Sequence, residues 1–174
     1  MRPAPESFDA GHLQGRRITA NDLPFVQTLM AHPAMNAHKP DPTPPSPAKI
    51  AEHHARDLSH WRRCGFGRYV VLCNGQSIGL CGLTRPDPAR PDGYSGLNLS
   101  YHLAPDHWGK GHASAMARAM VDLARVHLCD QGHIFGLARP ANPASARVLV
   151  KAGLIKSEDL ELGGAPTTRY TLVL

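Results

Sequence analysis

The stretch that decides the fold is LAPDHWGKGHA, residues 103–113, which lies between an alternating strand pattern and a long helix pattern. Pro105 ends the strand, and Gly109 and Gly111 remove side chains where the backbone turns into the helix. The N-terminus of a helix offers unpaired N–H groups and the positive end of the dipole, and both favour a phosphate. Glycines let those N–H groups approach phosphate oxygens closely, and Lys110 adds positive charge. The stretch therefore predicts an anion-binding turn, with a plain tight turn as the alternative.

Two common phosphate-binding motifs are absent from the chain. There is no GxxxxGK[ST] segment. Only Gly-x-Gly is present at residues 109–111, and no acidic residue closes a suitable second strand, so the dinucleotide-binding fingerprint is also excluded. The glycine turn therefore belongs to neither of these two motifs.

Strand patterns surround this turn. YVVL (69–72) is β-branched and aromatic, and Asn74-Gly75 predicts a tight hairpin into a return strand over 77–83. Residues 97–103 alternate between apolar and polar side chains, as expected of a strand with one buried face. Further strands are expected over 16–19, 133–138, 155–160 and 168–174.

Helix patterns separate these strands. Ser46 is expected to cap a helix whose first residue is Pro47, and Ile50, Ala51, His54, Leu58 and Trp61 share one face of it. Five prolines within 39–47 predict an extended surface loop before that helix. Other helices are expected over 21–32, 111–128 and 142–153, and residues 1–14 are expected to be a loose lead-in. The resulting order is a mixed sheet flanked by helices.

The composition suits one domain spanning residues 1–174. Hydrophobic residues make up 42% of the 174. No run approaches the length of a membrane helix, and the first residues contain no apolar stretch like that of a signal peptide. We therefore expect a cytoplasmic protein with no membrane partner.

The histidine count raises the question of a metal site. The chain has 11 His, but His53 and His54 are adjacent and no HExxH or HxH pair occurs. The spacing of five residues between His102, His107 and His112 runs across a strand, a loop and a helix start. The four cysteines form no CxxC pair, so we expect reduced thiols and no metal. These cysteines are Cys64, Cys73, Cys81 and Cys129.

The positive charge raises the question of nucleic acid. The net charge is +5, and the only adjacent basic pairs are Arg16-Arg17 and Arg62-Arg63. A nucleic-acid surface clusters basic residues with exposed aromatics, and this chain scatters them. We expect no nucleic-acid partner.

The segment WGKGHA (108–113) resembles the acyl-CoA pyrophosphate loop of the GCN5-related N-acetyltransferases (GNAT), whose pattern is [Gln/Arg]-x-x-Gly-x-[Gly/Ala]. Trp108 stands where Gln or Arg is usual, a replacement familiar in the branch that acetylates the N-termini of ribosomal proteins. NPAS (142–145) and VLVKAGL (148–154) look like that branch's Asn-x-x-Ser and Lys-x-Gly-Phe segments. SYHL (100–103) looks like its phosphate-loop strand. The resemblance covers about residues 15–174.

The resemblance implies an α/β (α+β) fold with a mixed, mostly antiparallel, splayed central sheet. The pantetheine arm of acetyl-CoA would lie in the splay, paired with backbone groups of Tyr101, His102 and Leu103. Asn142 would hydrogen-bond the pantetheine, and Ser145 would lie near the thioester sulfur. The alternatives are a core aromatic for Tyr101, a plain N-cap for Asn142 and a surface helix residue for Ser145. The pyrophosphate loop would be formed by Trp108, Gly109, Lys110, Gly111, His112 and Ala113.

The chemistry that the resemblance implies is direct attack of an amine on the acetyl thioester. A backbone N–H of the Tyr101 strand would polarise the carbonyl. Many relatives protonate the thiolate with a tyrosine at the position of Leu149, so Ser145, with water, is the candidate here. Relatives often carry a basic Glu near position 98, where this chain has Asn98. His102 is then the candidate base, with a packing role for His102 or a water chain as alternatives.

The acceptor is not visible in the sequence. A ribosomal-protein or peptide N-terminus is favoured by the resemblance, whereas small polyamines or aminoglycosides would need acidic residues such as Asp87, Asp92 and Asp106. Because both usual proton-transfer positions are replaced, a noncatalytic acyl-CoA sensor is the rival function. A homodimer is possible, as is common in this family. The expected acceptor pocket comprises the loops 39–47 and 85–95, the helix bearing His53, His54, Trp61 and Arg62, and the turn Gly163-Gly164.

Overall fold

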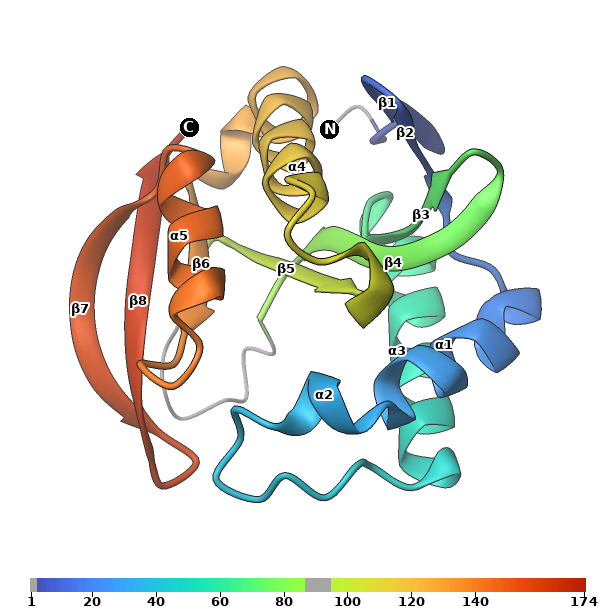
Figure 1. The fold of residues 1–174 in the computed structure, drawn as a ribbon. Coiled ribbons are helices and arrows are strands. Elements are labelled where there is room, and N and C mark those ends of the chain that lie inside the picture. Colours follow the sequence, from blue (N-terminus) through green and yellow to red (C-terminus); the bar gives the residue numbers. More distant parts are fainter. Residues whose placement is uncertain (1–2, 87–94) are drawn as a thin grey trace.

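The computed structural model describes residues 3–86 and 95–174, and its central element is an eight-stranded sheet (Figure 1). The strand order is β1-β2-β3-β4-β5-β6-β8-β7, and β5 and β6 pair in parallel while the other neighbours are antiparallel. This mixed, mostly antiparallel sheet confirms the predicted fold class. The strands are β1 (Ser7–Ala10), β2 (Leu13–Arg17), β3 (Arg68–Cys73), β4 (Gln76–Thr84), β5 (Leu97–Leu103), β6 (His133–Ala138), β7 (Ile155–Leu162) and β8 (Ala165–Val173).

The described residues form five α-helices beside the sheet, and α4 and α5 lie next to its central strands. α4 (His112–His127) packs against β1, β2, β4 and β5, and α5 (Pro143–Lys151) packs against β6, β7 and α4. α1 and α3 pack against each other, away from α4 and α5 (Figure 1). Within the described ranges, no helix combines the length and apolar character that crossing a membrane requires. The remaining helices are α1 (Leu23–Ala31), α2 (Pro33–Asn36) and α3 (Pro47–Cys64), with short 3-10 turns at Ala20–Asp22 (η1), Pro105–His107 (η2) and Cys129–Gln131 (η3).

Local signals in the sequence are realised as predicted. Asn74 and Gly75 take φ values of 51° and 77°, as the tight turn between β3 and β4 requires. Ser46 caps α3 by accepting a hydrogen bond from the Lys49 N–H at 3.2 Å, with Pro47 as the first helical residue. Ile50, His54 and Trp61 are buried on one face of α3, as the spacing predicted.

The prediction of a loose lead-in over residues 1–14 is wrong, because β1 forms there and pairs with β2. Phe8 packs edge-on against Tyr69 at 5.1 Å between ring centroids. Its ring occupies the space beside Gly15, where a Cβ would lie 1.9 Å from Phe8 Cε1. The strand is therefore held by tertiary packing, which the polar composition of residues 1–14 does not reveal.

Candidate active site

The sheet opens between β5 and β6. Their parallel ladder joins only Leu97 to Ile134 and Asn98 to Phe135, although both strands continue for several residues beyond (Figure 1). A cavity of about 810 Å³ occupies the opening, lined by both strands, the start of α4, α5 and residues from α1 to Lys39. The divergence of two neighbouring strands thus creates a cavity large enough to hold a ligand.

The backbone of β5 presents alternate residues to this opening. The Ala104 N–H donates to the Ile78 carbonyl of β4 at 2.8 Å. Backbone groups in an antiparallel strand alternate between its two sides, so those of His102 also face β4 while those of Tyr101 and Leu103 face the opening. The Leu103 carbonyl accepts a hydrogen bond from Trp108 Nε1 at 2.6 Å. Of the three residues expected to pair with pantetheine, Tyr101 is the one that presents both backbone groups.

The predicted pyrophosphate loop lies at the end of β5. Gly109 and Gly111 have φ values of 72° and 80°, which side chains disfavour, and no atom lies within 4 Å of a Cβ built on either. α4 begins at His112, and its first bond runs from the Ala115 N–H to the Gly111 carbonyl at 3.1 Å. The N–H groups of His112, Ala113 and Ser114 therefore have no intrahelical acceptor. The cavity is lined by Gly109, Gly111, His112, Ala113 and Ser114, whereas Lys110 is exposed outside it.

A tyrosine and a serine meet across the cavity. The Tyr101 hydroxyl donates to the Ser145 carbonyl at 2.8 Å and lies 2.9 Å from Ser145 Oγ. Burial raises the pKa of Tyr101 to about 12, so the phenol is protonated at neutral pH and can act as a donor. The contact between this hydroxyl and Ser145 cannot be predicted from the sequence, because a position on β5 does not indicate which residue of α5 it faces.

The start of α5 is fixed by Asn142. Its Oδ1 accepts a hydrogen bond from the Ser145 N–H at 3.2 Å, so Asn142 is an N-cap, and its amide nitrogen lies outside that bond. Leu149 is 1% exposed and fills the space above Gly136, where a Cβ would lie 2.4 Å from Leu149 Cδ2. Leu149 is therefore a core residue that donates no proton.

His102 lies on the opposite face of β5 from Tyr101, as strand alternation requires. Its Nδ1 is 3.5 Å from Arg68 Nη1, and Arg68 Nε is 3.5 Å from Asp57 Oδ1. Burial, together with the Arg68 charge, lowers the pKa of His102 to about 3. The imidazole is neutral at pH 7 but a weak base, which favours the packing role or the water chain. Asn98 lines the same cavity and offers an amide.

Cations and no carboxylates surround the far side of the cavity. Burial and the charge of Arg139 lower the pKa of Lys39, and both residues line the cavity. Arg139 Nη1 is buried without a hydrogen-bond partner. No Asp or Glu occurs among the described lining residues. Asp106 lies outside the lining, and Asp87 and Asp92 fall outside the described residues.

Of the expected acceptor regions, the proline loop 39–47 reaches the cavity through its first residue, Lys39. The turn Gly163-Gly164 does not line the cavity, although the preceding Leu162 of β7 does. No residue of α3 lines the cavity: His54 and Trp61 are buried in the core, whereas His53 and Arg62 are exposed. α1 and α2 replace α3 at the cavity through Met30, Ala34, Met35, Ala37 and His38, and nothing in the sequence pattern singled these out.

A splayed mixed sheet with glycines before the helix that follows the splay defines the class of acyl-CoA-binding acetyltransferases. The family model described as "Acetyltransferase (GNAT) domain" matches residues 12–155, and the chain belongs to this family. The resemblance of residues 108–113 to its pyrophosphate loop predicted this membership, and the prediction is confirmed.

One curated relative is "Uncharacterized protein YkkB" of Bacillus subtilis (strain 168), 30% identical over 96 residues, which are 55% of this chain. The match spans about half the length of that relative, 54% of it.

Solved structures show the same fold. An acetyltransferase from Agrobacterium tumefaciens str. C58 has a TM-score of 0.78 at 20% identity, covering 99% of this chain and 96% of that chain. A Salmonella typhimurium acetyl transferase that modifies the N-terminal serine of ribosomal protein L7/L12 has a TM-score of 0.77 at 18% identity. The match covers 97% of this chain and 99% of that chain. The aminoglycoside acetyltransferase AAC(6')-Ib with ribostamycin and coenzyme A has a TM-score of 0.77 at 19% identity. The match covers 92% of this chain and 93% of that chain.

The low pKa of His102 has a consequence for stability. A histidine in the unfolded chain has a pKa of about 6.5. Between that value and about 3 the unfolded chain binds a proton that folded His102 does not, so stability falls as the pH falls through this window. The unfolding free energy of the wild type should fall between pH 7 and pH 5. We expect the fall in His102→Gln to be smaller by about 1–2 kcal/mol.

Urea unfolding of both proteins at pH 5, 7 and 8 measures this difference. Between pH 7 and pH 8 the two proteins should change alike, because the histidine is neutral in both states there. An equal loss in both proteins on going to pH 5 would show that His102 is solvated and titrates normally.

Proposed function

We propose that the protein is an acetyl-CoA-dependent N-acetyltransferase that transfers the acetyl group to a primary amine by direct attack. The observation that carries the proposal is the cavity between the diverging β5 and β6, which ends at unpaired N–H groups of α4. An arm that lies along β5 and a pyrophosphate at a helix N-terminus match this shape. The complex of AAC(6')-Ib with coenzyme A has the same fold and supports the choice of cosubstrate.

The cosubstrate would be held mainly by backbone groups. The N–H and carbonyl of Tyr101 would pair with the pantetheine arm, and Asn142 would add its amide nitrogen. The pyrophosphate would receive the N–H groups of the loop, and Arg147 and Lys151 line the cavity as additional cations. Trp108 would act indirectly, since its bond to the Leu103 carbonyl fixes the path of the loop. The loop donors are those of Gly109, Lys110, Gly111, His112 and Ala113.

Tyr101 and Ser145 supply the proton for the leaving group in this proposal. The neutral amine nitrogen attacks the carbonyl carbon, the C–S bond breaks, and the thiolate takes a proton from the hydroxyl pair. The proton that the nitrogen loses as the amide forms passes to water, and water returns a proton to the hydroxyl pair. Tyr101 Oη and Ser145 Oγ are 2.9 Å apart, so the proton that one of them gives can be replaced through the other. General acid catalysis of this kind contributes roughly 10²–10⁴ in rate.

The amine loses its proton to water in this proposal. Asn98 has no basic group, and a histidine with a pKa near 3 holds a proton too weakly to take one from an ammonium. The acceptor then reacts from the fraction that is already neutral. A peptide α-amine, with a pKa near 8, supplies far more of that form at pH 7 than an aliphatic amine near 10.

The charge of the cavity also favours a peptide N-terminus over a polycation. Lys39 and Arg139 are partly buried at its far side without a lining carboxylate to neutralise them. A polyamine or an aminoglycoside would bring further positive charge into this field at a cost. An acceptor with a carboxylate near its amine would instead pair with the buried guanidinium. We therefore propose neutral or acidic peptide N-termini as acceptors.

A noncatalytic acyl-CoA sensor is the second candidate, because Asn98 and Leu149 stand where many relatives have proton-transfer groups. Calorimetry with acetyl-CoA, followed by a thiol-release screen over peptides and small amines, separates the two functions. An enzyme releases thiol only when an acceptor is present. A sensor binds acetyl-CoA and releases none with any amine.

Substitution of the loop glycine tests the cosubstrate site. Gly111→Ala places a side chain at a φ of 80°, which costs about 1–2 kcal/mol and turns the loop N–H groups away from the phosphates. We expect acetyl-CoA binding to weaken at least tenfold by calorimetry. Gly132→Ala is the matched control, since it has the same φ and the same empty surroundings outside the cavity. Equal affinities in the two variants would contradict the assignment of the loop.

Removal of the Tyr101 hydroxyl tests the proton donor. We expect Tyr101→Phe and Ser145→Ala each to lower kcat by about 10–100-fold, since the thiolate loses its donor, while acetyl-CoA affinity changes by less than about threefold. Ser157→Ala, at an exposed position of β7 outside the cavity, is the control and should keep the wild-type kcat. Steady-state thiol release gives kcat, and calorimetry gives affinity. An unchanged kcat in both site variants would remove these residues from the mechanism.

A peptide panel tests the acceptor. Peptides with acidic residues at positions two to four should exceed their lysine counterparts in kcat/KM by about tenfold at low salt, because of the nearby cations. Lys39→Glu should remove this preference, whereas Lys49→Glu, exposed on α3, should keep it. A wild-type preference for lysine peptides or for spermidine would refute the proposed acceptor.

A further inference from the structure

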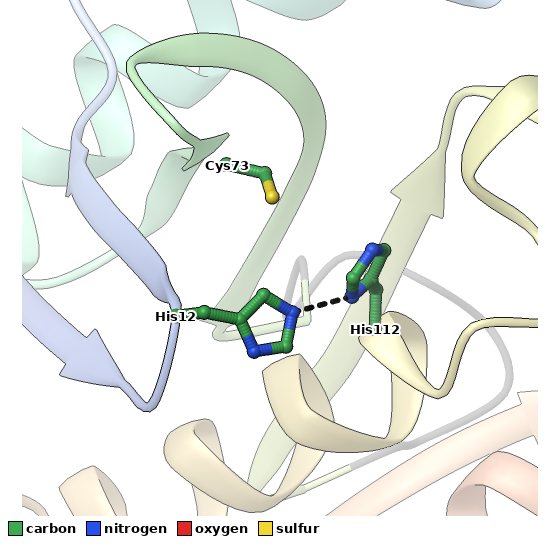
Figure 2. A group of neighbouring side chains, drawn as sticks. All are labelled: His12, Cys73 and His112. Atoms are coloured by element: carbon green, nitrogen blue, oxygen red, sulfur yellow. Dashed lines mark hydrogen bonds between the residues drawn. The ribbon is translucent and has the colours of Figure 1, made fainter.

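Three segments far apart in the sequence bring metal-binding side chains together beside the phosphate loop. His12 lies in the turn between β1 and β2, Cys73 ends β3, and His112 begins α4 (Figure 2). One ring nitrogen of each histidine and the Cys73 sulfur all lie within 4.8 Å of one another. Among the described residues, no other group of three or more His, Cys, Asp or Glu side chains is arranged in this way.

The two imidazoles are spaced as a metal ion requires. His12 Nε2 and His112 Nδ1 are 3.1 Å apart. A tetrahedral zinc with Zn–N bonds of about 2.0–2.1 Å holds two nitrogens about 3.3 Å apart, and a thiolate about 3.6 Å from each. Figure 2 shows the Cys73 sulfur turned toward the pair of rings.

We propose that His12, Cys73 and His112 form a site for a divalent transition-metal ion of the zinc type. Two imidazoles and one thiolate suit a borderline metal and not Mg²⁺ or Ca²⁺, which take oxygen ligands. The fourth position would hold a water or His107, whose ring centroid is 6.0 Å from that of His112. The ion would join the β1–β2 turn and the end of β3 to the first residue of α4.

The spacing of the histidines along the chain fits no local metal-binding motif, so the sequence alone predicts no metal. The three ligands come from three different elements, and only the pairing of β2 with β3, in which Leu13 is opposite Cys73, brings the first two together. The neutral explanation is a plain hydrogen bond between two imidazoles beside a thiol. The two explanations differ in whether the sulfur binds a metal.

Cobalt spectroscopy on the reduced, chelator-treated protein decides between them. One equivalent of Co²⁺ should give the visible bands of a tetrahedral ion and a near-ultraviolet thiolate-to-cobalt band. Cys73→Ser should abolish the thiolate band, whereas Cys64→Ser, a half-buried free cysteine at the end of α3, should keep it. A wild-type spectrum without the thiolate band, or one that survives Cys73→Ser, would overturn the proposal.

Zinc titration by calorimetry provides a second measurement. We expect one tightly bound Zn²⁺ per chain, a rise in Tm on binding, and at least a tenfold loss of affinity in His12→Ala. His12 is exposed, so its removal spares the core, and the exposed His53 on α3 gives the control His53→Ala. An affinity that is equal in the wild type and His12→Ala would also overturn the site. Both measurements are independent of any acetyltransferase activity.

Discussion

The constraint on which this structure depends is the short contact between β5 and β6. Two residues of each strand pair, and beyond them the backbone of β5 faces a cavity instead of a neighbouring strand. Buried backbone groups need partners, so an open seam inside a sheet is costly unless a ligand or side chains supply them. The Trp108 indole does so for the Leu103 carbonyl, and the Tyr101–Ser145 contact links β5 to α5. The opening thus leaves backbone groups of β5 without partners from a neighbouring strand, at the place where the candidate site lies.

The parts of the molecule that the sequence predicted are those determined by neighbours along the chain. The Asn74-Gly75 turn, the Ser46 cap and the glycines before α4 follow from backbone rules that act over a few residues. β1 was missed because its stability comes from Phe8 packing on Tyr69, a residue about sixty positions away in the chain.

Side-chain contacts between elements far apart in the sequence could not be predicted either. The Tyr101–Ser145 pair requires knowing how α5 is rotated against β5, and the low pKa of His102 requires knowing that Arg68 lies beside it. The charge around Lys39 and Arg139 likewise arises only because the segments that follow α2 and β6 line the same cavity. The residue types at these positions can be read from the sequence, but the charges around them depend on how the chain folds.

The bond from Trp108 to the end of β5 closes residues 103–108 into a small ring before any ligand arrives. Most binding loops lose conformational entropy when they take hold of a ligand, and that loss is subtracted from the affinity. Here the indole has already restricted the backbone that leads to Gly109 and Gly111. An aromatic residue in place of a charged or amide side chain at this position therefore exchanges a direct contact with the ligand for a loop that is ordered in advance.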